Sequence, residues 1–294
     1  MQAILKRMLR TYGEKSEYTV IKEKLEHVAW SLACEYEENM PEFYELMNIV
    51  AEYKNTLPTN NNWVTDDLVA LICPEVRQNT IFSKLSELIY MTTIQRVAGK
   101  GEILVALLCG DSEKAKKHGD VRVGGKNIEA KANTASIHQE EDSRYSEYNA
   151  LLREFFDVTP DAIKTKYRKW YPLPALLMSG KEAVDFYSKL YRKWGDDKLW
   201  QIKKVWDETN DPEIRSQELG YLVLCEYMQH KGIDGILFTE IDKKDGKIKT
   251  VYLTDISDKE FIRENLLMKP QKFRGSSNQS CPDGQVLIQI RKNK

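Results

Sequence analysis

The feature that most constrains the fold is a glycine pair, Gly124-Gly125, between two short strand-like runs at 120–123 and 126–132. Glycine readily accepts the positive φ angles that a tight two-residue hairpin turn requires. Apolar residues alternate with polar ones in both runs, with valine in the first and isoleucine and alanine in the second, as in half-buried strands. The sequence therefore predicts a β-hairpin over residues 120–132.

The turn length fixes the register of this hairpin. Val123 lies opposite Lys126, and counting outward brings Asp120 opposite Glu129. Because side chains alternate between the two faces of a strand, one face carries the polar residues: Asp120, Arg122, Asn127, Glu129 and Lys131. The other face carries small apolar residues that suit packing: Val121, Val123, Ile128, Ala130 and Ala132.

Two carboxylates in opposed positions, Asp120 and Glu129, destabilise a bare hairpin. A divalent cation between them would offset that repulsion, since Mg²⁺ is commonly bound by one or two carboxylates together with water and phosphate. Lys131 lies on the same face and can hold or deprotonate a water molecule beside the metal. The arrangement suits metal-assisted hydrolysis of a phosphodiester.

Asp120 followed by Glu129-Ala130-Lys131 resembles the D…(D/E)xK signature of the PD-(D/E)XK nuclease superfamily, which includes restriction endonucleases and repair nucleases. The signature's proline is absent, because Gly119 precedes Asp120. The phrase from Gly119 to Lys131 is also similar to nuclease-like proteins of large phages. The resemblance covers about residues 99 to 135 and implies a restriction-endonuclease-like α/β fold, with a mixed β-sheet core flanked by helices.

The resemblance also implies roles for individual residues. Many members carry a further glutamate on a preceding helix, and Glu102 fits that place. Asp120, Glu129 and Glu102 would bind metal together with the backbone carbonyl of Ala130, and Lys131 would position the nucleophilic water. The expected catalytic set is therefore Asp120, Glu129, Lys131 and Glu102, with Mg²⁺ as cofactor and Mn²⁺ as its substitute.

The expected function is cleavage of DNA by a metal-dependent endodeoxyribonuclease of the restriction type. An endonuclease is favoured over an exonuclease because no ATPase or helicase motif accompanies the site. Double-strand cleavage favours a homodimer. The alternative is a non-catalytic DNA-binding or virion structural protein with a nuclease-like fold. A simpler interpretation of the same residues is a surface hairpin whose charged side chains are solvated and have no catalytic role.

Three segments are expected: a helical N-terminal region at 1–98, a nuclease core at 99–138 plus 212–294, and a helical insertion at 139–211. Thr65-Asp66-Asp67 is typical of a helix N-cap. Residues 101–109 predict a buried helix, and Asp111 is expected to start another. Further along, the pattern predicts a helix at 213–230 and strands at 235–241, 249–256 and 285–291.

The insertion alternates basic and aromatic residues, a pattern that suits phosphate contacts and base stacking. The candidate DNA-binding residues are Lys164, Lys166, Arg168, Lys169, Arg192 and Lys193. The simpler interpretation is an amphipathic helix with its aromatic residues in the core. The core is the expected place of Trp170, Trp194, Trp200 and Trp206. His118 and His138 flank the proposed site and are expected to be polar loop residues.

Composition limits the remaining classes of function. The five cysteines form no CxxC pair, which argues against a zinc site and favours a reducing compartment, the cytoplasm. No apolar run approaches the roughly 18 residues that cross a bilayer, so no membrane is expected as a partner. The formal net charge of −1 gives no overall attraction to DNA.

Overall fold

A computed structural model describes residues 41, 55–76, 99–115, 118–133, 135–137, 145–156, 175, 177–242, 244–270 and 286–292. The chain forms two compact units. Unit 1 takes its described residues from 1–133, 231–265 and 292–294, and unit 2 from 134–230 and 266–291.

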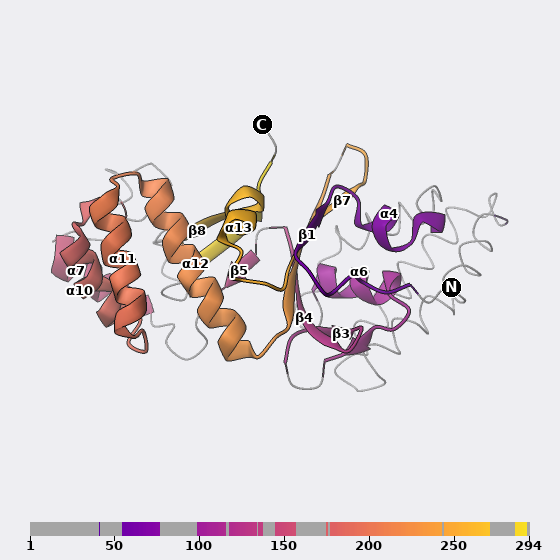
Figure 1. The fold of residues 1–294 in the computed structure, drawn as a ribbon, viewed down its shortest axis with the longest axis horizontal. Helices are drawn as coiled ribbons and strands as arrows, with labels where there is room; N and C mark the ends of the chain where they lie inside the picture. Colours follow the sequence, from indigo (N-terminus) through magenta and orange to yellow (C-terminus); the bar gives the residue numbers. More distant parts are fainter. Residues whose placement is uncertain are drawn as a thin grey trace. The chain divides into compact units, whose positions relative to one another are not determined.

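Unit 1 is built on a six-stranded mixed sheet with the order β1-β7-β6-β4-β3-β2. Its strands are β1 (Trp63–Thr65), β2 (Glu113–Lys114), β3 (Val121–Val123), β4 (Lys126–Ala132), β6 (Gly235–Ile241) and β7 (Ile248–Leu253). Figure 1 labels the strands β1, β3, β4 and β7 of this sheet. The β4–β6 pair is parallel and the other four pairs are antiparallel. The fold is thus mixed α/β, as the sequence predicts.

The hairpin forms in the predicted register. Val121 pairs with Ile128 and Val123 pairs with Lys126. Gly124 and Gly125 have φ angles of 57° and 79°, which a two-residue turn of this type requires. Val121, Val123, Ile128 and Ala130 are buried and Ala132 is half-buried, so the predicted packed face is confirmed over most of its length.

Helix α6 (Lys100–Leu108) packs on the apolar face of the hairpin. Its residues Ile103, Leu104 and Val105 are fully buried, which confirms the predicted buried helix. A Cβ added at Gly101 would lie 3.4 Å from the Cβ of Ala130, so the absence of a side chain lets the helix approach β4 closely. This contact sets the first turn of α6 beside the middle of β4.

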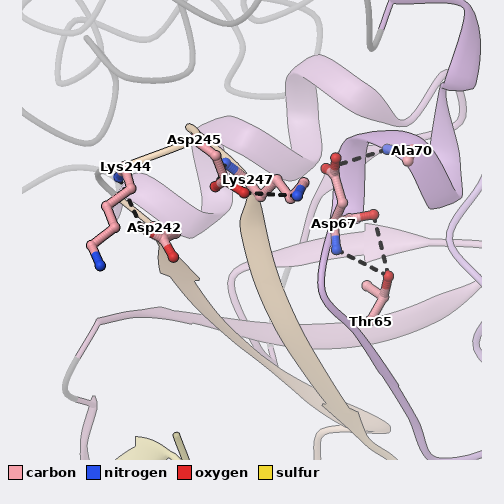
Figure 2. Close-up of polar contacts among 7 residues, drawn as sticks. All are labelled: Thr65, Asp67, Ala70, Asp242, Lys244, Asp245 and Lys247. Atoms are coloured by element: carbon pink, nitrogen blue, oxygen red, sulfur yellow. Dashed lines mark hydrogen bonds and ion pairs between the residues drawn. The ribbon is translucent and has the colours of Figure 1, made fainter. Parts of the chain in front are cut away.

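The segment before α6 departs from the helical prediction for residues 1–98. Trp63–Thr65 forms β1, which pairs with β7 at the edge of the sheet. Pairing with a strand almost two hundred residues later leaves no local pattern, so a three-residue strand was missed. The predicted N-cap is confirmed, because the Asp67 carboxylate accepts the Val69 and Ala70 N–H groups at the start of α4 (Leu68–Ile72), as Figure 2 shows for Ala70.

The remaining described elements of unit 1 are a 3₁₀ turn (Pro74–Val76) and helix α13 (Lys259–Asn265). The β6–β7 hairpin turns at Gly246, whose φ is 68°, and Asp242 and Asp245 each accept a backbone N–H two residues later (Figure 2). The expected helix start at Asp111 was wrong. The Asp111 carboxylate instead accepts the Gly124 N–H at 2.8 Å and so holds the β3–β4 turn, while β2 follows.

Unit 2 combines helices with a small antiparallel sheet of order β5-β9-β8. Its elements are α7 (Tyr145–Phe156), α10 (Gly180–Leu190), α11 (Asp196–Glu208), α12 (Pro212–Lys231, whose last residue belongs to unit 1), β5 (Ala135–Ile137), β8 (Leu266–Pro270) and β9 (Val286–Ile290). The predicted helix at 213–230 and the predicted last strand are confirmed. Strands β8 and β9 form this second sheet with β5 and do not join the sheet of unit 1.

A buried arginine organises the helices of unit 2. Arg215 is 2% exposed, and its guanidinium donates to the carbonyl oxygens of Thr209, Ala175, Met178 and Trp206 and to Oδ1 of Asn210. It also lies over the Trp206 ring. Burial lowers the pKa of this group from its usual value. Every nitrogen of the guanidinium donates to at least one oxygen, so Arg215 has a structural role in holding these segments of unit 2 together.

The four tryptophans that were predicted to lie in the core differ in their burial. Trp194 and Trp206 are buried beside Tyr191 and Tyr187, as predicted. Trp200 is 61% exposed, so its assignment to the core was wrong. Its position on α11 lies outside the stripe that carries Ile202 and Trp206. Trp170 lies outside the described residues.

The two units cut across the predicted segments. Residues 55–76 belong to unit 1, where β1 joins the sheet, while most of α12 and the strands β8 and β9 belong to unit 2. The helical character expected for 139–211 holds where the structure describes it, in α7, α10 and α11. No helix in the described parts of the chain is long and apolar enough to cross a membrane.

Candidate active site

The site begins where β3 leaves β4. The Asp120 N–H donates to the Ile128 carbonyl at 2.9 Å, one residue before β3 starts. Gly119 has a φ of 75°, and a Cβ there would lie 2.9 Å from the Ile128 oxygen. Only glycine fits this close passage without strain. The chain therefore turns away from β4 directly before Asp120.

Where the backbone hydrogen bonds between β3 and β4 end, the Asp120 carboxylate bonds to β4 instead. Its Oδ2 accepts the Ala130 N–H at 2.9 Å. In a strand the N–H and C=O of one residue point to the same side. The Ala130 carbonyl therefore points toward the gap that β3 leaves, beside the Asp120 carboxylate. This is the carbonyl that the sequence resemblance implies as a metal ligand.

Glu129 and Lys131 lie on the opposite face of β4 from Ala130, because side chains alternate along the strand. Glu129 is 3% exposed, which is rare for a carboxylate unless it is paired. Its Oε1 accepts a hydrogen bond from Nζ of Lys131 at 2.5 Å. Lys131 keeps a quarter of its side chain exposed, so this ion pair connects a buried carboxylate to the solvent.

Glu102 comes to the same place from α6. It occupies the third position of the helix, and its Oε1 accepts the Gly99 N–H at the helix start. Burial raises the pKa of Glu102 to about 8, with a further contribution from the nearby charge of Asp120. The close approach of α6 to β4 at Gly101 accounts for this proximity.

Asp120 is perturbed in the same way. Burial raises its pKa to about 6, and the negative charge of Glu129 adds to the effect. The charges of Lys131 and Lys231 and the Ala130 N–H act in the opposite direction. Three carboxylates therefore share a poorly solvated region that does not favour full ionisation. Strongly perturbed groups of this kind cluster at functional sites more often than elsewhere.

The donor chemistry of this region fits a hard divalent cation. Its donors are carboxylate oxygens and one backbone carbonyl, which Mg²⁺ and Mn²⁺ prefer. A cation would also offset the repulsion between the carboxylates, which adds to the effect of burial in raising the pKa values of Asp120 and Glu102. Among the described residues, no three His, Cys, Asp or Glu side chains converge on one point as a ready-made ion site. A bound ion would therefore draw on Asp120, Glu129 and the Ala130 carbonyl, with Glu102 nearby.

The structure thus brings Glu102, Asp120, Glu129 and Lys131 together in unit 1. It also adds Lys231, which the sequence gave no reason to select. Lys231 precedes β6, and β6 pairs in parallel with β4 although more than a hundred residues separate them. The only available signal was that a helix between two parallel strands returns the chain to the sheet beside its starting strand.

The candidate DNA-binding residues lie elsewhere in the sequence, between positions 164 and 193. Lys164, Lys166, Arg168 and Lys169 lie outside the described residues. Arg192 and Lys193 are exposed in the short turn between α10 and α11 of unit 2. Nothing in the described contacts assigns them a nucleic-acid partner, so they stay a prediction.

Comparison of the chain with models of protein families, with curated proteins and with solved structures found no match.

Proposed function

We propose that this chain is a metal-dependent deoxyribonuclease of the PD-(D/E)XK type that hydrolyses DNA phosphodiester bonds. The observation that carries the proposal is the end of the β3–β4 ladder. There the Asp120 carboxylate replaces a backbone partner at Ala130, directly beside the Glu129–Lys131 ion pair. The pKa of Asp120, which burial and the charge of Glu129 raise, supports the same reading, because perturbed carboxylates are more frequent at functional sites.

The order of elements around this point also supports the proposal. Helix α6 supplies a glutamate, the β3–β4 hairpin supplies the D…ExK residues, and β6 adds a parallel strand to give a mixed sheet. This is the arrangement that the sequence resemblance implies. The restriction-endonuclease-like fold belongs to the proposal together with the activity.

Each residue has a defined task in this proposal. Asp120, Glu129 and the Ala130 carbonyl would bind Mg²⁺ or Mn²⁺, and Glu102 would support that ion directly or through water. The bound ion would activate water and stabilise charge on the phosphate. Lys131 donates an N–H to the attacking water and so orients it toward phosphorus. Its pairing with Glu129 holds the ammonium on the face where the water must lie.

A cleavage assay tests the proposal. Supercoiled and linear DNA are incubated with Mg²⁺ or Mn²⁺ and with wild type, Asp120→Asn or Lys131→Ala. Lys126→Ala is the matched control, because Lys126 lies on the same strand but on the opposite face. Discrete fragments that vanish in both site variants would establish a restriction-type endonuclease, and a smear that vanishes would establish a nonspecific one. Absence of cleavage, or cleavage that survives both substitutions, would overturn the assignment.

A non-catalytic DNA-binding or virion structural protein with the same fold is the second candidate. It is favoured by the direct bonds that the carboxylates of Asp120 and Glu102 already make to the backbone. Isothermal titration with Mn²⁺ separates the two. The nuclease binds the ion and loses it on Glu129→Ala, whereas the structural protein shows the same weak signal in both forms.

A further inference from the structure

A second lysine, Lys231, lies near the Asp120 carboxylate and comes from a helix end, whereas Lys131 comes from β4. Lys231 is the last residue of α12 and stands four residues before β6. Its side chain is half-buried. It is close enough to Asp120 for its charge to lower the pKa of that carboxyl. Two lysines, Lys131 on β4 and Lys231 at the end of α12, therefore lie near one acidic centre.

The path of the chain before Asp120 explains this proximity. The segment 118–120 crosses over β4, because a Cβ at Gly119 would lie within 3.2 Å of the Ile128 nitrogen, carbon and oxygen. Beyond that crossing His118 reaches Gly232, where an added Cβ would lie 3.2 Å from Nδ1 of His118. Gly232 has a φ of 59°. The turn after Lys231 is thus held against the same segment that carries Asp120.

We propose that Lys231 is a substrate-binding residue, which holds a phosphate oxygen of the bound nucleic-acid strand beside the Asp120–Glu129–Lys131 site. This inference rests on the proposed nuclease function and names the second contact that the strand makes there. An acidic centre repels a polyanion, so the strand needs fixed positive charge at its edge as well as at the metal. Lys131 is engaged with Glu129, and Lys231 supplies that charge from the β6 side.

The simpler role for Lys231 is local. A lysine at the last position of a helix interacts favourably with the negative end of the helix dipole and with exposed carbonyls. A lysine near Asp120 could also act only by tuning that carboxylate. These roles affect folding stability or metal affinity, and neither one changes how DNA binding responds to salt.

The test is the salt dependence of DNA binding. Fluorescence anisotropy with a labelled 20-base-pair duplex, in Ca²⁺ so that the DNA stays intact, is measured from about 50 to 300 mM KCl for wild type, Lys231→Gln, Lys231→Arg and Lys126→Gln. Loss of one phosphate contact lowers the slope of log K against log salt by about 1. We expect that change, with a roughly 5- to 20-fold weaker affinity, in Lys231→Gln alone. Lys231→Arg should keep most of the affinity.

Several results would overturn the inference. One is an unchanged slope in Lys231→Gln. Another is a loss of affinity that matches Lys126→Gln or that appears only where thermal unfolding shows the variant to be partly unfolded. A shift confined to Mn²⁺ affinity, measured without DNA, would assign Lys231 to tuning of Asp120 instead. Absence of any DNA binding by the wild type would overturn it as well.

Failure of the nuclease proposal can be distinguished from failure of the Lys231 phosphate contact. If wild type binds duplex with a slope that depends on Lys231 but cuts nothing in Mg²⁺ or Mn²⁺, the nuclease proposal fails and the phosphate contact stands. If wild type cuts DNA and Lys231→Gln cuts with an unchanged KM, the contact fails and the nuclease stands.

Discussion

Each unit buries charge, and the two do so in opposite ways. In unit 2 a single guanidinium, Arg215, meets five oxygen acceptors from four backbone carbonyls and one side chain. In unit 1 three carboxylates lie together with one paired lysine, and the pKa values of Asp120 and Glu102 rise. A buried charge is tolerated in a fold when its hydrogen-bonding groups are satisfied, whereas strongly perturbed titratable groups are more frequent at functional sites than elsewhere. The contrast marks Arg215 as structural and the acidic group of unit 1 as the candidate functional site.

The largest expected effect is on activity in unit 1. In the proposed nuclease Lys131 orients the attacking water, so we expect Lys131→Ala to lower cleavage by about 10²- to 10⁴-fold. The unfolding free energy should fall as well, because the buried Glu129 carboxylate loses the Lys131 ammonium. Single-turnover cleavage of a labelled duplex measures the first quantity, and urea denaturation measures the second. Lys126→Ala should alter neither, and an equal loss in that control would remove the distinction between the two faces of β4.

The second effect is on stability in unit 2. Arg215→Met leaves buried carbonyls without donors, and such changes cost about 3–5 kcal/mol of unfolding free energy. Arg192→Met, at an exposed position in the same unit, should cost under about 0.5 kcal/mol. Urea denaturation followed by circular dichroism measures both. Similar losses in the two variants would show that the acceptors around Arg215 contribute nothing special.

A third effect joins pH and metal in unit 1. Because Asp120 and Glu102 have raised pKa values, the folded state holds more protons than the unfolded chain between pH about 4 and 8. Stability should therefore be highest below that window and fall as pH rises through it. Mn²⁺ at about 100 times its dissociation constant should restore roughly 2.7 kcal/mol at pH 8. Thermal denaturation at pH 5 and 8, with Mn²⁺ or EDTA, tests this, and a midpoint indifferent to both would contradict it.

The smallest effect concerns Glu102 alone. Glu102→Gln keeps an oxygen for the Gly99 N–H but removes one charge from the crowded centre. We expect the pH 8 protein to gain about 1 kcal/mol while cleavage slows. Glu113→Gln, at an exposed acid of β2 in the same sheet, is the matched control. A loss of stability in Glu102→Gln would mean that this carboxylate serves the helix start more than the site.

Sequence reasoning succeeded where the signal is local. The Gly124-Gly125 turn fixes the register of β3 and β4, and period-two alternation then assigns every side chain of that hairpin to a face. The same local logic found α6 and the β6–β7 hairpin. It also predicted that Asp120, Glu129 and Lys131 lie near one another.

It failed where pairing is distant. Strands β1 and β5 pair with strands far along the chain, and no pattern in three residues records such a partner. The exact role of Asp120 was also hidden. The register places it opposite Glu129, but the turn at Gly119 directs its carboxylate to the Ala130 N–H. Lys231 stayed invisible for the same reason as β1.

The parallel pairing of β4 with β6 has a further consequence, for the order in which the protein can form. Thr239 donates a hydrogen bond to the Lys131 carbonyl from 108 residues away. Such high contact order slows folding, because the entropy of closing a long loop is lost before the contact is made. During synthesis the ribosome must release the whole intervening chain before β4 gains its inner neighbour. A nascent or truncated chain that ends before β6 therefore carries the Glu129–Lys131 strand without the support that buries it.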